Sequence, residues 1–234
     1  MTRTQWAAIT AVVLALVFAG TAAVASAGRD GGSAAPSTPT ADSADAGFAR
    51  DMAVHHQQAV EMSFIVRDST DDEEVRRLAY DIANTQANQR GMLLGWLDMW
   101  GLPKVESGRG PMAWMSMDKT MDHGSGSGMD MDMGSMDHGD AGHRAEDGSL
   151  MPGMATKTEL DQLRDARGKA AEILYLQLMT DHHKGGVAMA QGCVQLCAPG
   201  TEKNLAEGMV AAQRSEMALM ADLLTARGAK PRTG

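Results

Sequence analysis

The sequence MAVHHQQAVEM, residues 52–62, returns in related form as MTDHHKGGVAM at residues 179–189. Both stretches follow the pattern Met-x-x-His-His-x5-Met, and the offset between them is 127 residues. At this offset, and without a gap, ten of the 54 positions from 48 to 101 are identical in the second copy. The chain therefore contains a duplicated unit, and its two copies should adopt the same local structure.

The spacing of the pattern matters if each copy is an α-helix. Each helical residue advances the chain by 100°, so the first Met, the first His and the last Met of a copy fall within about 80° of one another. Thioether and imidazole groups together suit copper, and thioethers especially suit Cu(I). The candidate ligands of the two copies are Met52, His55, His56, Met62, Met179, His182, His183 and Met189.

A purely structural role also accounts for a stripe of this kind. Methionine at helical spacing commonly fills irregular gaps in a core, because its side chain is flexible. A histidine on such a face is commonly a core or boundary residue with its hydrogen bonds satisfied. Two copies in register, each with a histidine pair, favour the metal-binding interpretation.

The fold class follows from composition and periodicity. Ala, Leu, Met, Glu and Gln dominate the repeated segments, as helix propensity favours, and no strand-like alternation of any length occurs. We predict an all-α protein in which helical hairpins at 47–101 and 156–228 are joined by a long disordered crossover at 102–155. Together they form one ferritin-like four-helix bundle domain over 47–228. A capping box at Thr156 and Glu159 starts a single helix expected to continue to Leu196.

The charge and the N-terminus indicate the class of protein. A formal charge of -9 argues against a nucleic-acid partner. Residues 1–27 contain Arg3, an apolar run and the ending Ala25-Ser26-Ala27, which is the form of a secretory signal peptide. The run is also long enough for an uncleaved transmembrane signal anchor that tethers the protein to a membrane. In both cases the protein is exported, secreted or periplasmic, and residues 28–46 form a flexible tether.

The only two cysteines are Cys193 and Cys197. In an exported protein such a pair commonly forms a disulfide, and Cα atoms four residues apart on a helix lie close enough for one. The alternative is a thiolate site for Cu(I) or Zn.

The crossover has an unusual composition. Ten of the 20 methionines of the chain lie between Met112 and Met154, in a segment rich in Gly, Ser and Asp. Exposed methionines have no packing reason to cluster there, although compositional drift would also produce such a run. The soft and acidic groups could wrap an ion. The candidate ligands are Met121, His123, Met129, Met131, Met133, Met136, His138 and His143.

The paired His-His helices resemble the domain-of-unknown-function 305 family, together with the segments Gln86-x-x-Gln89 and Gln213-x-x-Glu216 on the partner helices. The resemblance covers about residues 48–101 and 174–228. It implies an exported bacterial ferritin-like bundle associated with copper or silver, with the histidine pairs and flanking methionines at its characteristic positions. The Met-Asp-His units of the crossover are also similar to the methionine motifs of periplasmic copper-resistance proteins.

These observations favour an exported copper-binding protein that sequesters or transfers Cu(I) or Cu(II), with Cu(I) preferred and Ag as a substitute. Its partners would be the metal ion and copper-trafficking proteins. The alternatives are a copper-dependent oxidase using the four paired histidines, which no sequence feature favours, and a metal-free interaction module. Because histidine binds metal only when neutral, Cu(II) binding is expected to weaken below about pH 6.

Overall fold

The computed structural model describes residues 38–119 and 147–233, with side chains 117–119 excluded, and within these ranges it contains helices and no strands. The prediction of an all-α fold is confirmed. All the helices belong to one compact unit that begins at Pro39. In the described part of the chain, no helix combines the length and the apolar character that a membrane span needs. The expected signal peptide or anchor at 1–27 lies outside the described residues.

The first hairpin consists of α2 (Ala44–Ser69) and α3 (Glu73–Met99). The side chain of Ser43 accepts a hydrogen bond from the Ala46 amide, and this cap starts α2. Asp72 caps α3 in the same way. Helix α2 therefore begins at Ala44, three residues before the expected position 47, so the end of the predicted tether at 28–46 is helical.

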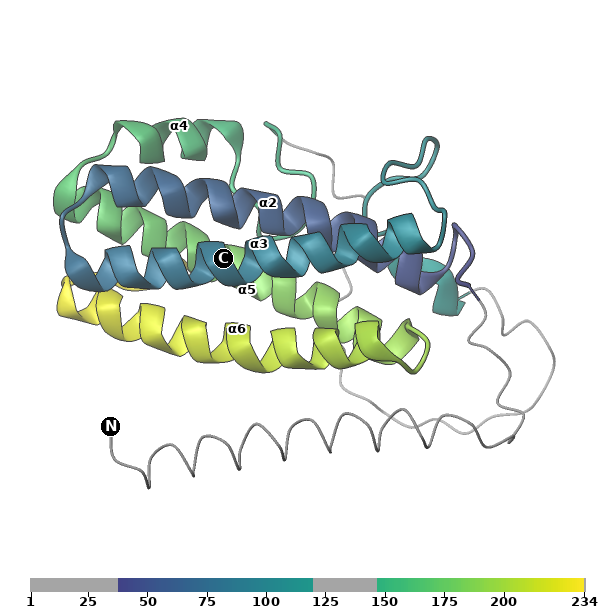
Figure 1. Ribbon diagram of the computed structural model, residues 1–234. Helices are drawn as coiled ribbons and strands as arrows, with labels where there is room; N and C mark the ends of the chain where they lie inside the picture. The colour runs from purple at the N-terminus through teal and green to yellow at the C-terminus, as the bar shows by residue number, and fades with distance from the viewer. Residues whose placement is uncertain (1–37, 120–146, 234) are drawn as a thin grey trace, which may run out of the picture. The chain divides into compact units, whose positions relative to one another are not determined.

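The second hairpin consists of α5 (Gly168–Leu196) and α6 (Thr201–Ala226), preceded by the short helix α4 (Lys157–Asp165). Both hydrogen bonds of the capping box between Thr156 and Glu159 are formed. The prediction of a single helix from Thr156 to Leu196 is wrong, because the chain is extended at Ala166 and Arg167. Gly168 then adopts a φ of +53°, a conformation that glycine tolerates better than other residues. This break lets α4 lie along the outside of α2 (Figure 1).

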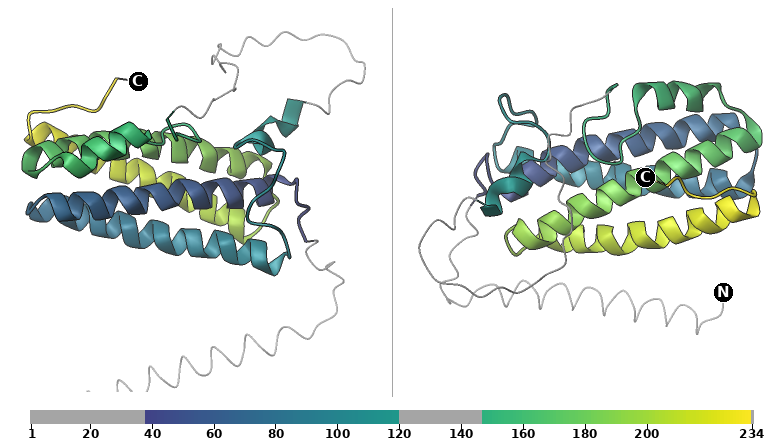
Figure 2. Two further views of the ribbon diagram at one scale, coloured as in Figure 1. Left: turned by 90° about the horizontal axis from the view of Figure 1, so that it is seen from above. Right: turned by 180° about the vertical axis from the view of Figure 1, so that it is seen from behind.

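The two hairpins pack through α2 and α5 (Figures 1 and 2). The core consists of two apolar clusters. One contains Met62 and Met179, and the other contains Met52 and Met189. Since the later methionine of α2 shares a cluster with the earlier methionine of α5, the two helices run antiparallel.

Both ends of the crossover pack on the bundle, which corrects the prediction that the whole crossover is disordered. At one end, the 3-10 helix η2 (Ala113–Lys119) places Trp114 edge-on against Phe48, with ring centroids 5.8 Å apart. At the other end, the Gln58 side chain forms two hydrogen bonds, of 2.7 and 2.9 Å, with the backbone of Ala155. Met151 is buried in the same apolar cluster as Trp114. The packing of these two ends was not predicted, because a composition rich in Gly, Pro and Met does not show which residues contact an apolar surface that is distant in sequence.

Candidate metal centre

Four histidines lie in the interior of the bundle, between the two methionine-containing clusters. Helix α2 provides His55 and His56, helix α5 provides His182 and His183, and all four are fully buried. The ring of His55 lies against the ring of His182, with centroids 3.7 Å apart and planes tilted by 33°. The ring centroid of His183 is 6.3 Å from that of His182. The sequence did not show whether the two pairs meet, and the antiparallel packing of α2 and α5 brings them together.

Two hydrogen bonds define which ring nitrogens carry a proton. His182 Nε2 lies 3.0 Å from the backbone oxygen of His55, and His183 Nε2 lies 2.7 Å from Oε2 of Glu216. A carbonyl or carboxylate oxygen only accepts, so each Nε2 must donate. In a neutral imidazole the other nitrogen, Nδ1, then has a free lone pair. His182 and His183 therefore each present Nδ1 as a potential metal ligand.

The remaining ring nitrogens lack partners. Both nitrogens of His55, both of His56, and Nδ1 of His182 and His183 have no hydrogen-bond partner among the residues that the structure describes. Each buried polar group left unsatisfied costs about 1–3 kcal/mol, whereas a domain has a net stability of only about 5–15 kcal/mol. Six such nitrogens in one layer are a large cost for packing alone, and a bound water or ion is the kind of group that satisfies lone pairs of this sort.

Burial also determines the charge of the rings. It holds the pKa of His55 down to about 3, with a smaller contribution from His183. Burial and then His55 have the same effect on His56, whose pKa is also about 3 despite an opposing effect of Gln89. The pKa of His182 is lowered as well, again chiefly by burial. These rings are neutral at pH 7, and neutral imidazole is the form that binds metal ions.

The four methionines of the repeated pattern are fully buried and flank the histidine layer. Met62 and Met179 lie in the cluster on one side, and Met52 and Met189 in the cluster on the other. Their burial is explained by packing alone, because methionine fills irregular apolar space. Their role as ligands therefore stays a prediction.

Two glutamine side chains, on α3 and α6, are also buried in the bundle. Gln86 and Gln213 are counterparts in the two copies, and neither the amide nitrogen nor the amide oxygen of Gln86 has a partner in the described parts of the chain. Gln213 packs over Gly186, where an added Cβ would lie 2.5 Å from Oε1. These positions carry part of the family resemblance but were not among the predicted site residues. The offset of 127 residues between Gln86 and Gln213, which equals that of the histidine pairs, was the available signal.

The geometry restricts the chemistry of the layer. Within residues 38–119 and 147–233, the only three residues of the types His, Cys, Asp and Glu whose ligand atoms all lie within 4.8 Å of one another are Asp45, Cys197 and Glu202. The histidines therefore do not form the three-ligand arrangement of catalytic zinc sites. The arrangement offers neutral imidazole nitrogens at close range, with thioethers in the flanking clusters.

The sequence also predicted ligands in the crossover. They fall in the segment 120–146, outside the described residues: Met121, His123, Met129, Met131, Met133, Met136, His138 and His143. The predicted cysteine pair lies elsewhere, at the end of α5, where Cys193 and Cys197 are joined by a disulfide.

Comparison with protein families gives a match over residues 45–224 to the family described as Domain of unknown function (DUF305). The chain belongs to this family. The resemblance carried by the His-His helices is thus confirmed, and the matched range includes nearly all of both hairpins and the whole crossover.

Solved structures show the same fold. A DUF305 protein from Streptomyces coelicolor, described as secreted, is 58% identical, with a TM-score of 0.68, and the match covers 83% of this chain and 100% of that one. A DUF305 fragment from Deinococcus radiodurans is 26% identical, with a TM-score of 0.57 and coverages of 82% and 99%. CopM in its Cu(I)-bound form is 17% identical, with a TM-score of 0.52 and coverages of 78% and 96%. No curated protein matches the chain.

Proposed function

We propose that this DUF305 protein is an exported copper-binding protein that sequesters or transfers Cu(I) through its buried histidine layer. The observation that carries the proposal is a set of six ring nitrogens on four fully buried histidines that have no hydrogen-bond partner within residues 38–119 and 147–233. A bound ion would satisfy lone pairs of these rings and remove much of their desolvation cost.

The charge of the layer supports a monovalent ion. The carboxylate of Glu216, which accepts a hydrogen bond from His183, lies at the edge of this layer. A Cu(I) ion would balance one carboxylate charge, whereas a divalent ion would leave a net positive charge in a buried environment, which is costly. Imidazole with thioether suits copper, and thioether favours Cu(I). Ag(I), with the same charge and softness, is the expected substitute.

Two proteins of similar structure also support copper binding and export. CopM, whose fold is similar, has a solved structure with Cu(I) bound, so a bundle of this kind is compatible with copper. The relative from Streptomyces coelicolor is described as secreted, and this supports export of the present chain. In our proposal the Met- and His-rich segment 120–146 collects ions from copper-trafficking partners and the histidine layer retains them.

The decisive test compares the two histidine groups in the full mature chain. One variant replaces the core group, His55, His56, His182 and His183, by Leu, and a matched control replaces the crossover group, His123, His138 and His143. Anaerobic titration of Cu(I) against a competing chelator, with copper X-ray absorption, reports affinity and ligand type. We expect the core variant to lose the tightest site and its nitrogen scattering, while the control retains both.

Circular dichroism establishes that each variant is folded before the comparison is made. Equal Cu(I) affinity and equal nitrogen scattering in the core variant and the wild type would contradict the proposal. So would a wild-type protein that binds no Cu(I).

Two contacts favour a second reading, in which the protein is a metal-free helical interaction module. The bonds from His182 to the His55 carbonyl and from His183 to Glu216 both link different helices, as a structural role requires. This reading leaves both nitrogens of His55 and His56 unexplained. Absence of Cu(I) binding by titration, with an unchanged fold, would support it.

A further inference from the structure

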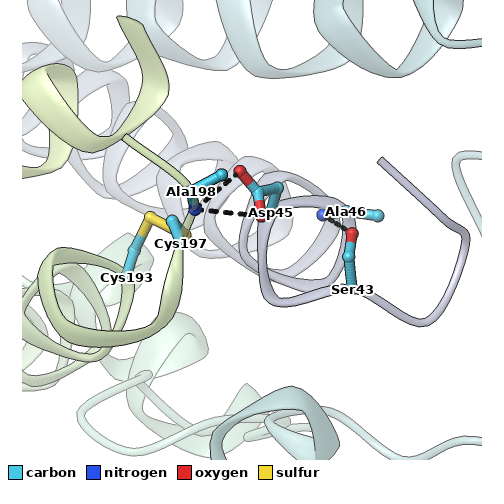
Figure 3. Close-up of a disulfide and its surroundings, with 6 residues drawn as sticks. All are labelled: Ser43, Asp45, Ala46, Cys193, Cys197 and Ala198. Carbon is cyan, nitrogen blue, oxygen red and sulfur yellow. Dashed lines mark hydrogen bonds between the residues drawn. A yellow bond between two sulfur atoms is a disulfide. The ribbon is translucent and has the colours of Figure 1, made fainter. Parts of the chain in front are cut away.

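A second group of potential ligands lies at one end of the bundle, where three helix ends meet. Asp45 is in the first turn of α2, Cys197 caps the end of α5, and Glu202 is in the first turn of α6. One ligand atom from each residue lies within 4.8 Å of the other two. Figure 3 shows Asp45 beside the disulfide, where its carboxylate oxygens accept from the Ala198 amide at 3.2 and 3.3 Å.

Glu202 has surroundings that do not suit a carboxylate. Its side chain is buried, with the residue 5% exposed, and neither oxygen has a hydrogen-bond partner in the part of the chain that the structure describes. Burial, and then the nearby Asp45, raise the pKa of Glu202 to about 9. Asp45 adds negative charge where Glu202 needs a cation or a hydrogen-bond donor. A buried carboxylate that has no hydrogen-bond partner in the described residues and lies beside a second carboxylate is a group that a bound cation would stabilise.

The disulfide keeps the two cysteine sulfurs from acting as metal ligands. Cys193 and Cys197 are both buried, and their sulfurs are bonded to each other. Disulfide sulfur carries no charge and binds metal ions poorly, whereas the thiolate is the metal ligand. Reduction would therefore add two strong ligands next to two carboxylates.

We propose that this end of the bundle is a redox-gated site for a borderline divalent cation of the zinc class, formed by Cys193, Cys197, Glu202 and Asp45. An external dithiol makes the site available by reducing the Cys193–Cys197 disulfide. The dithiol supplies two electrons and two protons and itself becomes a disulfide, while the S–S bond of the protein breaks to give two thiols. The ion then displaces the two thiol protons to solvent. Two sulfur and two oxygen ligands match the preference of zinc for four-coordinate sites with Cys and Asp or Glu.

The site is independent of the histidine layer, because it shares no residue with it. Its test uses Co²⁺ as a visible substitute for zinc, since thiolate bound to Co²⁺ gives a charge-transfer absorption that imidazole does not. The full chain is reduced with a dithiol, freed of reductant without oxygen and titrated with Co²⁺. We expect the thiolate band in the reduced protein and its absence in the oxidised protein.

Variants then test the carboxylate. Glu202→Gln should weaken Co²⁺ binding to the reduced protein by at least about tenfold, while Glu207→Gln, at an exposed position of the same helix, should leave it unchanged. Cys193→Ser with Cys197→Ser should abolish the band, with helical content checked by circular dichroism.

Three results would overturn the proposal: no thiolate band in the reduced wild type, the same band in the oxidised protein, or an unchanged affinity in Glu202→Gln. Loss of Cu(I) binding in the core histidine variant with the Co²⁺ band intact would concern the histidine layer alone.

Discussion

The rings of His55 and His182, equivalent positions in the two copies of the repeat, lie 3.7 Å apart at the contact between α2 and α5. Equivalent residues of a duplicated unit meet when the two copies are related by an approximate two-fold axis, and the antiparallel helices agree with that relation. The two rings are nevertheless unequal. His182 donates to the His55 backbone, while neither nitrogen of His55 has a partner in the described residues. A complete layer therefore requires both hairpins.

Replacing His56 by Leu should stabilise the metal-free protein while weakening copper binding. Both ring nitrogens of His56 are buried and unpartnered within the described structure. An apolar side chain removes that desolvation cost, and we expect the free energy of unfolding to rise by about 1–3 kcal/mol. Urea unfolding and Cu(I) competition titrations measure the two effects. His183→Leu is the matched control, because it removes a real hydrogen bond to Glu216 and should not stabilise. A loss of stability in His56→Leu would contradict the prediction.

The stability of the metal-free protein should fall as the pH falls from about 6.5 to about 3. The folded-state pKa values of His55 and His56 are about 3, below the reference value of 6.5. Within this window the unfolded chain binds protons that the folded chain does not, so acid favours unfolding. Each histidine should contribute about 1.4 kcal/mol per pH unit. Denaturant unfolding at several pH values measures the slope, and His56→Leu should reduce it. Equal slopes in the two proteins would contradict this account.

Copper binding should resist acid better than the sequence alone predicts. Ordinary imidazole would be protonated below about pH 6, and this was the reason to expect weakening there. Burial keeps His55 and His56 neutral at that pH, so protons compete less with the metal. We expect copper bound in the core to be retained at pH 5 for as long as the bundle stays folded. Metal retention after dialysis at pH 7 and pH 5, with circular dichroism of the same samples, checks this; loss of copper from a folded protein at pH 5 would refute it.

The stability of the bundle should depend on how much of the crossover is deleted. Replacing residues 120–146 by a Gly-Ser linker should lower the number of copper ions bound and leave helical content unchanged. Deleting 112–154 also removes Trp114 and Met151, which are buried in the core. That loss should cost several kcal/mol, since truncating a buried Trp alone costs about 3–5 kcal/mol. Thermal unfolding and metal analysis distinguish the two deletions, and equal stability would contradict the role given to the two ends.

A close backbone approach on α5 should make Gly185 intolerant of substitution. A Cβ at Gly185 would lie 1.9 Å from the backbone oxygen of Pro152, and backbone cannot move aside as a side chain can. Gly185→Ala should destabilise the protein by about 1–3 kcal/mol, as overpacking does. Gly208→Ala is the control, because nothing lies within 4 Å of its Cβ position in α6 and an Ala there should stabilise by about 0.5–1 kcal/mol. Thermal unfolding of both variants tests the contrast.

Local pattern was sufficient for the helices and for the face that each buries. The spacing of Met52, His55 and Met62 depends only on the helical period, and all three are buried. Helix boundaries were less accurate, because Ser43 starts α2 early and the backbone at Gly168 interrupts the second hairpin. The packing of Trp114 and Met151 depends on distant apolar surfaces that no local composition reveals.

The residue pattern alone shows two related helical hairpins, each with thioether and imidazole groups on one face. The contact of His55 with His182, and the burial of Glu202 beside Asp45 and the disulfide, are visible only in the folded bundle. The difference lies in the range of the forces involved. Helical periodicity acts between residues three or four positions apart. The contacts of His55 with His182 and of Asp45 with Glu202 instead join residues 127 or more positions apart, and they follow from how the hairpins pack.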